Sequence, residues 1–466
     1  MVIPPREKMK RYLPILIPIV VFLLLKISNL GIRLSDTNIY FYTAYQLLQG
    51  KVLYRDIFFT NFPVLPYISM IYFYIVGKSL SWYYITAAIE ASIVSFLLFY
   101  LILQKTKEKL IALTTSLLYL FSFIILATTD HQTGVFLASL FALLSYLFVF
   151  EKKQYLLGGV FIALALLTKA YFLPVFLAIL ITLAIKDYRK SFLFLLGVGG
   201  ATFLILLPSL LLARNELIKD VFIYSLTRSQ GISKTHILWF FLRHDFLLVI
   251  SLLFSLVMIR KYLFFGLFSL FSLFFIFFYQ DIYYLYLNFA IPFLCMSFAN
   301  LQSFLHDKIR LQKMVVPTIV LVFSLSNLFI YLPSYRNLQK IEGIGQILSL
   351  VKKENPPVLY GVNSITPALA YLSNKPLLNG IVDTNENIFR KGFLNTNTLT
   401  HDAIAQKAMI VTIGAFYPSF NVQEDIIGGI FNKDLVKKSC TLKGSFPTKT
   451  EGIENRINLF SCQPSE

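Results

Sequence analysis

Two acids flank an aromatic-rich stretch between the first two long apolar runs of the chain. Asp36 directly follows the run that ends at Leu34, and Asp56 comes twenty residues later. A carboxylate held at the edge of a membrane can take the proton of a hydroxyl group on a substrate. We therefore expect Asp36 to be a general base that serves a lipid-linked substrate, and Asp56 to shape the substrate pocket.

Asp36 also has a simpler structural role open to it. Residues 37–49 are predicted to form a short interfacial helix, with Ser35 or Asp36 as its N-cap and Gly50 as its C-terminal stop. Such a cap stabilises a helix by about 1 kcal/mol. One carboxylate can do both if its second oxygen faces a cavity, so both roles stay open.

The other acids predicted on the outer side can also have either a structural or a substrate-binding role. Asp56 can form a loop ion pair with Arg55 or Lys51 instead of contacting a substrate. Asp130 and His131 are adjacent in a very short predicted outer loop, where they can bond sugar hydroxyls, orient the base or simply form a polar turn. A metal site needs more ligands than this pair supplies, so a divalent metal is compatible with the sequence but not required by it.

Several cations on the predicted outer side call for an anionic partner. Lys169 ends a short apolar segment, where it either snorkels to the surface or contacts a phosphate. The loop 214–245 is the main exception to a basic inner side. Its predicted substrate-binding residues are Arg228, His236, Arg243 and His244. A lipid phosphate is the expected partner, either as part of a substrate or as a lipid headgroup.

Two further charges fall inside apolar runs. Lys26 lies ten residues before Asp36, and Glu90 lies nine residues after Ser81. At 1.5 Å per residue, both should sit about 14–15 Å below the outer boundary. Because charges inside a membrane usually pair or line a cavity, we expect Lys26 and Glu90 to face each other.

Composition identifies a membrane protein. The 466 residues are 57% hydrophobic and 14% charged, with a mean hydropathy of +0.69. The net charge of +18 does not indicate a nucleic-acid partner, because the basic residues gather at the ends of apolar runs. Apolar runs long enough to span a hydrocarbon core of ~30 Å recur over the first 330 residues.

We predict about eleven transmembrane helices. Their expected ranges are 13–34, 81–103, 110–127, 135–150, 155–168, 170–185, 192–213, 246–259, 262–279, 285–305 and 314–332. Lys and Arg in the intervening loops place the N-terminus in the cytoplasm and the C-terminus outside the plasma membrane. Residues 1–333 then form an all-α membrane domain whose first outer loop covers 35–80.

Residues 334–466 are predicted to form a small extracytoplasmic α/β domain. They contain strand-like segments at 357–361 and 408–414 and a helical patch at 366–372. An outer location would allow Cys440 and Cys462 to pair. The loop 379–397 is where we expect contacts with an acceptor.

The order of these features resembles the GT-C integral-membrane glycosyltransferases, in the branch of the protein O-mannosyltransferases and aminoarabinose transferases. The likeness covers about the first 330 residues. It rests on the acid after the first span, LLQGKVLYRDIFFTNFPVLPY (47–67), TTDHQTG (128–134) and GGVFIALALLTKAYFLP (158–174). Many relatives carry two adjacent acids in these loops, whereas here Asp36 precedes Thr37 and Asp130 precedes His131.

The resemblance implies an inverting transfer of a sugar, such as the hexose mannose, from a polyprenyl-phosphate carrier. By the same likeness Asp36 matches the catalytic carboxylate and Asp130 the acid of the second outer loop, with Lys169 near the carrier phosphate. The acceptor, which can be a lipid, a polysaccharide or a protein, is not encoded in these motifs. Two other functions remain open, a flippase for lipid-linked glycans and a glycan polymerase that uses a diphosphate-linked substrate.

Overall fold

The computed structural model describes residues 5–228, 231–308, 312–336, 341, 343–415, 429–450 and 453–463. Contacts divide the chain into two compact units. The first unit comprises residues 1–29, 85–206 and 230–335. The second unit comprises residues 30–84, 207–229 and 336–466. The predicted boundary after residue 333 lies beside one of these divisions, but the first outer loop groups with the C-terminal residues.

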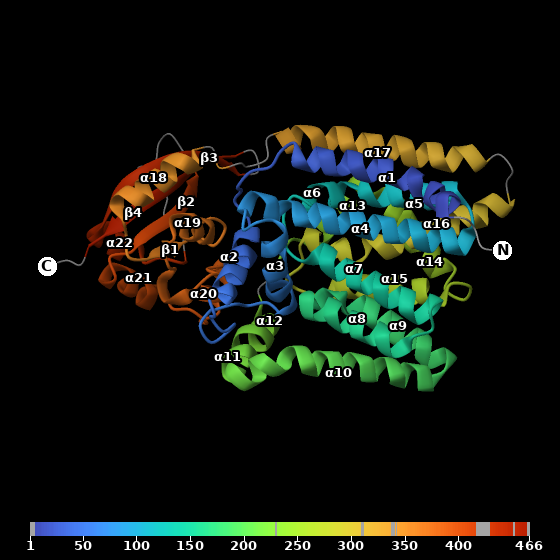
Figure 1. The fold of residues 1–466 in the computed structure, drawn as a ribbon, viewed down its shortest axis with the longest axis horizontal. Helices are drawn as coiled ribbons and strands as arrows, with labels where there is room; N and C mark the ends of the chain where they lie inside the picture. The colour runs from blue at the N-terminus through green and yellow to red at the C-terminus, as the bar shows by residue number, and fades with distance from the viewer. Residues whose placement is uncertain are drawn as a thin grey trace. The chain divides into compact units, whose positions relative to one another are not determined.

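Helices lie in all eleven segments that were predicted to span, so the all-α character of this region is confirmed. They are α1 (Pro5–Ile27), α4 (Leu80–Thr106), α5 (Lys109–Leu120) with α6 (Phe123–Thr128), α7 (Val135–Tyr146) with η1 (Leu147–Glu151), α8 (Tyr155–Thr168), η2 (Ala170–Phe172) with α9 (Leu173–Lys186), α10 (Tyr188–Leu212), α14 (Phe246–Val257), α15 (Leu263–Phe278), η4 (Tyr284–Phe289) with α16 (Ile291–Lys308), and α17 (Gln312–Arg336). Figure 1 shows these helices, with α1 and α17 side by side.

Three of these helices are each long and apolar enough to cross a membrane. They are Leu80–Thr106, Tyr188–Leu212 and Met314–Pro333. Helix α13 (Lys234–His244) and α14 form a fourth candidate that is bent by 106°. The other apolar helices are shorter, so the number of eleven spans stays a prediction.

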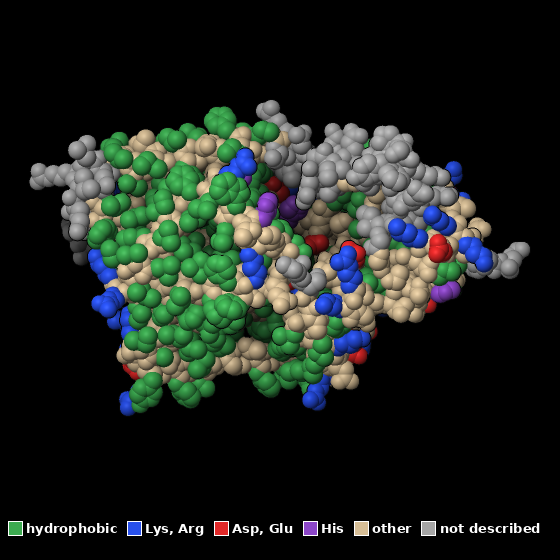
Figure 2. All heavy atoms as spheres, turned by 180° about the vertical axis from the view of Figure 1, so that it is seen from behind, with side chains coloured by type: hydrophobic (Ala, Val, Ile, Leu, Met, Phe, Trp, Pro, Cys, Tyr) green, Lys and Arg blue, Asp and Glu red, His purple; other side chains and the backbone are tan. Residues whose placement is uncertain are grey.

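The outward faces of these helices suit lipid rather than water. Large apolar side chains such as Leu204, Phe274 and Leu321 are exposed at 68%, 59% and 49%. Figure 2 shows apolar side chains spread over the surface of the helices. A monomer in water rarely exposes apolar patches on this scale, whereas a bilayer favours them. The chain is a multi-pass membrane protein.

Glycines let two helices of the first unit approach closely. A Cβ atom added at Gly159 of α8 would lie 2.1 Å from the carbonyl oxygen of Phe194 in α10. One added at Gly197 of α10 would lie 2.1 Å from the carbonyl oxygen of Leu156. The two backbones are therefore in direct contact, the arrangement that small residues permit between membrane helices.

The first outer loop folds into two helices that pack together in the second unit. They are α2 (Thr37–Leu48) and α3 (Val64–Ile75). Phe41 of α2 stacks on Phe73 of α3 with ring centroids 4.5 Å apart. On its other side Phe41 meets Tyr371 edge-on at 4.7 Å. An aromatic cluster therefore joins the first outer loop to the C-terminal residues within this unit.

The C-terminal residues form a four-stranded sheet in the order β1-β2-β4-β3. The strands are β1 (Leu359–Gly361), β2 (Met409–Ala415), β3 (Cys440–Thr450) and β4 (Ile453–Cys462). β1 and β2 are parallel, and the other pairs are antiparallel. The surrounding helices are α18 (Ile344–Glu354), α19 (Thr366–Ser373), α20 (Glu386–Arg390), α21 (Thr396–Ala405) and α22 (Lys433–Ser439). The predicted α/β character and its two strands are confirmed, whereas the β3–β4 hairpin was not predicted.

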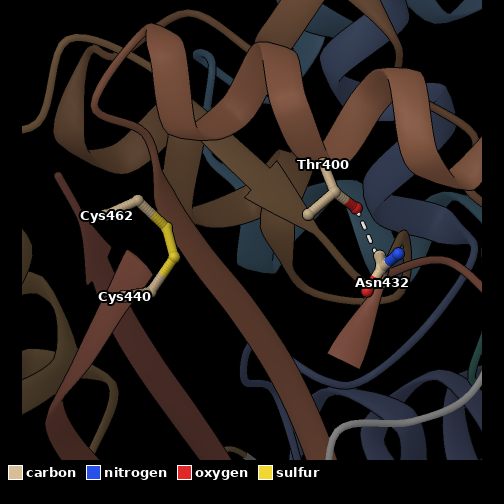
Figure 3. Close-up of a disulfide and its surroundings, with 4 residues drawn as sticks. All are labelled: Thr400, Asn432, Cys440 and Cys462. Atoms are coloured by element: carbon tan, nitrogen blue, oxygen red, sulfur yellow. Dashed lines mark hydrogen bonds between the residues drawn. A yellow bond between two sulfur atoms is a disulfide. The ribbon is translucent and has the colours of Figure 1, made fainter. Parts of the chain in front are cut away.

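A disulfide joins the first residue of β3 to the last residue of β4. Cys440 and Cys462 are cross-strand partners with Cα atoms 4.0 Å apart, as Figure 3 shows. Nearby, the backbone N–H of Asn432 donates to Thr400 Oγ1 at 3.0 Å, which joins the start of α22 to α21. The pairing that the sequence allowed but left open is therefore present.

Candidate functional site

Asp36 stands out by its exposure. From Arg33 to Ala44 every residue is buried except Asp36, which is exposed. Its backbone takes the N-cap position of α2, but its side chain makes no capping hydrogen bond. The Thr37 N–H instead donates to Ser35 Oγ at 3.1 Å. The Asp36 carboxylate is therefore presented at a surface while the residues beside it are held in place.

The segment around Asp36 is fixed by its neighbours on both sides. Asn38 Nδ2 donates to the carbonyl oxygen of Arg33 at 2.9 Å and to that of Ser364 at 2.5 Å. The Ser35 N–H donates to the same Ser364 oxygen at 3.0 Å. The Tyr84 hydroxyl lies 2.9 Å from Asn38 Oδ1. These bonds tie the turn before α2 to a C-terminal loop and to the start of α4.

Arg33 is a residue that the sequence reasoning missed. It is only 3% exposed, and its guanidinium lies 5.8 Å from the centre of the Tyr84 ring. A buried cation three residues before Asp36 is well placed to influence the charge of any group bound there. The sequence could have identified Arg33, because it is a cation inside the apolar run that was predicted as the first span.

Asp56 is used by its own loop. Its carboxylate accepts two hydrogen bonds from Arg55, at 3.0 Å and 2.9 Å, and one from the backbone N–H of Val52 at 2.8 Å. These bonds hold the pKa of the Asp56 carboxyl at about 2. The alternative role as a loop ion pair is therefore what the structure supports, and a substrate contact stays a prediction.

Asp130 lies in a buried cluster of the first unit. Lys26 Nζ is 3.0 Å from Asp130 Oδ1, with both side chains 2% exposed. The Tyr331 hydroxyl donates to Asp130 Oδ2, and Lys26 also donates to Tyr331 Oη at 2.6 Å. A buried carboxylate needs such a partner, because an unpaired charge there would be strongly destabilising. α1 and α17 together hold Asp130 after α6.

The structure pairs the two predicted intramembrane charges with residues of the second outer loop. Lys26, expected to face Glu90, forms its ion pair with Asp130. Glu90 Oε1 accepts a hydrogen bond from Gln132 Nε2 at 2.7 Å, and the same amide donates to Thr86 Oγ1 at 2.8 Å. The count of residues along each helix predicted how deep Lys26 and Glu90 lie in the membrane. It could not predict the direction in which each side chain points.

A buried acid that the sequence reasoning did not select holds the start of α6. Asp245 accepts hydrogen bonds from the backbone N–H groups of Phe123 and Ile124, at 2.9 Å and 3.1 Å. Asn327 of α17 donates to Asp245 at 3.4 Å and to the carbonyl oxygen of Phe121 at 3.1 Å. α17 thus holds the segment 121–130 at both ends, through Asn327 at Phe121 and through Tyr331 at Asp130.

The remaining predicted residues divide between the two units. Asp130, His131, Lys169, His236, Arg243 and His244 belong to the first unit, and Asp36, Asp56 and Arg228 to the second. Lys169 is 8% exposed at the C-terminal end of α8, and His236 and Arg243 are exposed on α13. His244 stacks on Phe123 at 4.4 Å, and the Arg228 guanidinium lies 5.1 Å from the Tyr224 ring centre.

The described residues include no group of three or more His, Cys, Asp or Glu side chains arranged to hold a metal ion. Asp130 and His131 therefore have no third side chain of these types gathered around them within the described ranges. The second unit offers the exposed Asp36 and the buried cation Arg33. The first unit, taken by itself, holds the buried cluster of Lys26, Asp130 and Tyr331.

Comparison with known proteins agrees with this architecture. Residues 61–211 match the family model described as dolichyl-phosphate-mannose-protein mannosyltransferase. No curated protein sequence matches the chain.

Solved structures share the fold over nearly the whole chain. ArnT from Cupriavidus metallidurans in the apo state superposes with a TM-score of 0.66 at 12% identity, covering 95% of this chain and 97% of that one. The same enzyme bound to undecaprenyl phosphate gives a TM-score of 0.62 at 13% identity, with the same coverage. The match over residues 61–211 and the shared fold together support a membrane glycosyltransferase of the GT-C type.

Proposed function

We propose that this protein transfers a sugar, a hexose such as mannose, from a polyprenyl-phosphate carrier to an acceptor hydroxyl at the outer face of the cytoplasmic membrane. The fold is shared with an enzyme that was crystallised with undecaprenyl phosphate. The matching family model is named for a donor of the same chemical type, a sugar linked to a polyprenol-type phosphate. Both likenesses favour a monophosphate carrier as the leaving group.

The exposure of Asp36 in an otherwise buried segment is the observation that carries the proposal. Its carboxylate does not cap α2, and so it can face a substrate while the turn stays fixed. Asp36 removes the proton of the acceptor hydroxyl as that oxygen attacks the anomeric carbon. Because the attack comes from the side opposite the departing phosphate, the configuration of the sugar is inverted. General base catalysis of this kind contributes about 10²–10⁴-fold.

Cations stabilise the departing phosphate in this proposal. Arg228 belongs to the same unit as Asp36, and Lys169 of the first unit is a buried lysine, 8% exposed. A positive charge interacts more strongly with a phosphate where water is excluded. Arg243 and His236 are exposed on α13 and can attract the carrier headgroup.

The test is glycan and glycolipid mass spectrometry on a strain that lacks the gene. The strain is complemented with the wild type, with Asp36→Asn, or with Asp434→Asn, an exposed acid on α22 that serves as the matched control. The wild type and the control should restore a mass increment of one sugar. Asp36→Asn should reduce it by about 10²-fold or more at equal protein level.

Other outcomes point to the other functions. Full activity of Asp36→Asn would show that Asp36 is not the general base, and Asp130 would be the next candidate. Accumulation of a complete lipid-linked glycan on the inner side, with no change in mass, would support a flippase. Release of polyprenyl diphosphate rather than monophosphate in the transfer reaction would support a polymerase.

A further inference from the structure

A turn of the C-terminal sheet lies directly beside Asp36 in the second unit. The turn comprises residues 362–365 and follows β1. The Ser364 carbonyl oxygen accepts hydrogen bonds from the Ser35 N–H and from Asn38 Nδ2, at 3.0 Å and 2.5 Å. Because Ser35 and Asn38 stand on either side of Asp36, the turn is anchored to the backbone segment that carries Asp36.

The turn itself is rigid. Asn363 Nδ2 donates to Asp383 Oδ1 at 3.1 Å, and Thr60 Oγ1 donates to Asp383 Oδ2 at 2.9 Å. Asp383 is 7% exposed, and its Oδ1 also accepts the Asn385 N–H at 3.1 Å. One buried carboxylate thus fastens the turn after β1 to the first outer loop. A binding site held in this way loses little conformational entropy when a ligand enters.

The turn also offers polar groups that the fold does not use. Asn363 and Ser364 are half-buried, whereas Gly361 before them and Ile365 after them are buried. Within the described part of the chain, no hydrogen bond involves Ser364 Oγ or Asn363 Oδ1. An amide oxygen and a hydroxyl, both neutral, suit the hydroxyl groups of a sugar. The turn follows the carboxyl end of a parallel strand pair, the edge where open α/β sheets collect ligand groups.

We propose that Asn363 and Ser364 belong to the substrate site at Asp36 and hydrogen-bond the hydroxyl groups of a sugar. The C-terminal domain then contributes binding groups of its own. This inference rests on the proposed function, because it takes Asp36 to be the centre at which a sugar reacts. The sugar is either that of the donor or a sugar of the acceptor, and the experiment separates these two sources.

The experiment uses the purified full-length chain in lipid nanodiscs. Membranes of the deletion strain supply both donor and acceptor and are titrated as the substrate. The double variant Asn363→Ala/Ser364→Ala is compared with Asn355→Gly/Ser349→Ala, two positions of the same domain outside the loop 379–397. The control also removes an asparagine amide that holds one neighbour and a serine hydroxyl, and glycine suits the left-handed backbone at residue 355. Thermal unfolding midpoints show whether both double variants fold like the wild type.

We expect the double variant to need about 25-fold more membrane for half-maximal rate, because each of the two lost hydrogen bonds weakens binding by about five-fold. Its maximal rate should stay within about two-fold of the wild-type rate. Addition of purified sugar-loaded lipid, the polyprenyl-phosphate-linked sugar extracted from the deletion strain, should by itself relieve the defect if the donor sugar is bound. If only more membrane relieves it, the acceptor sugar is bound.

Two results would overturn the inference. One is an apparent KM equal to that of the control. The other is a lower maximal rate with an unchanged KM, which would mean that the turn only supports Asp36. If the double variant does not fold, the same assay is made with Ser364→Ala alone, because the Ser364 hydroxyl has no hydrogen bond within the described residues and its loss should not unfold the domain. Asp36→Asn in the same assay tests the proposed function separately, since it should be inactive at every membrane concentration.

Discussion

Asp36 and Asp56 belong to one loop of the chain, yet their carboxylates are used differently. Asp56 is satisfied by Arg55 and the Val52 N–H, and these bonds keep it ionised far below neutral pH. Asp36 is exposed and makes no capping bond. Residue type and spacing selected both acids, but only the structure shows that the Asp56 carboxylate is bonded within its own loop whereas Asp36 is exposed.

Asp220 shows how burial alone changes an acid. It lies in η3 (Ile218–Ile223) and is 5% exposed. Burial raises the pKa of its carboxyl from 3.8 to about 6, while Lys219 lowers it slightly. The folded state therefore holds the proton more tightly than the unfolded state. The destabilisation that Asp220 causes is absent below pH 4, develops between pH 4 and 6, and is complete above that range.

Asp220→Asn should therefore be more stable than the wild type at neutral pH. A shift of about two pKa units corresponds to about 2–3 kcal/mol in the free energy of unfolding. The measurement is the thermal unfolding midpoint of both proteins between pH 4 and 7.5. The difference in midpoint should be smallest at pH 4 and grow to a plateau above pH 6. A difference that does not change with pH would contradict the assignment.

Tertiary contacts hold the short helix α6, which precedes Asp130. α6 has only six residues and would not be stable alone. Asp245 binds its first N–H groups, and Lys26 donates to the Leu126 carbonyl oxygen near its end. Tertiary hydrogen bonds therefore hold this helix and, through it, Asp130. Close backbone contact also fixes α8 against α10 at Gly159 and Gly197.

Gly159→Val should push α8 and α10 apart, because the added side chain would overlap the Phe194 carbonyl oxygen. Overpacking of this kind costs about 1–3 kcal/mol. The matched control is Gly199→Val, since a Cβ atom at Gly199 of α10 meets nothing within 4 Å. Unfolding midpoints in detergent should fall for Gly159→Val and stay near the wild-type value for Gly199→Val. Equal midpoints for the two variants would argue against the close contact.

At the scale of the whole molecule, three distant segments of the chain build the second unit. Ser364 accepts bonds from residues beside Asp36, Asp383 accepts one from Thr60, and the Tyr371 hydroxyl donates to the Lys78 carbonyl oxygen at 2.7 Å. The first outer loop and the C-terminal residues therefore form one folded body. They do not behave as a catalytic loop with a separable appendage.

A chain that ends at Tyr335 should consequently lose transfer activity and the order of its first outer loop. Without the sheet, residues 30–84 lose the partners of Ser35, Asn38 and Thr60. Limited trypsin digestion should cleave after Lys51 and Arg55 at least about ten-fold faster, as expected for a loop that opens locally. A chain that ends at Gln463 is the control and should behave like the wild type. Unchanged activity of the shorter chain would show that the C-terminal residues are dispensable.

The sequence by itself determined the class of this protein and most of its helices. A single apolar run that crosses a bilayer folds as a helix, because a helix pairs every backbone N–H and C=O group within the run where no water is present. Gathered cations at the ends of these runs gave the predicted topology, and the acid after the first run pointed to Asp36. Alternation of apolar residues and turn residues located β1 and β2. Each of these sequence patterns is local, because a single short stretch of the chain contains it.

Only the tertiary structure decided which residues meet. Lys26 and Glu90 were predicted to lie at comparable depths and to face each other, whereas in the structure Lys26 pairs with Asp130 and Glu90 accepts a hydrogen bond from Gln132. Likewise, no local pattern joins Ser364 to Ser35, because 329 positions separate them and the bond depends on how the sheet packs on α2. Contacts between distant segments arise from packing of whole elements, which periodicity along one segment does not encode.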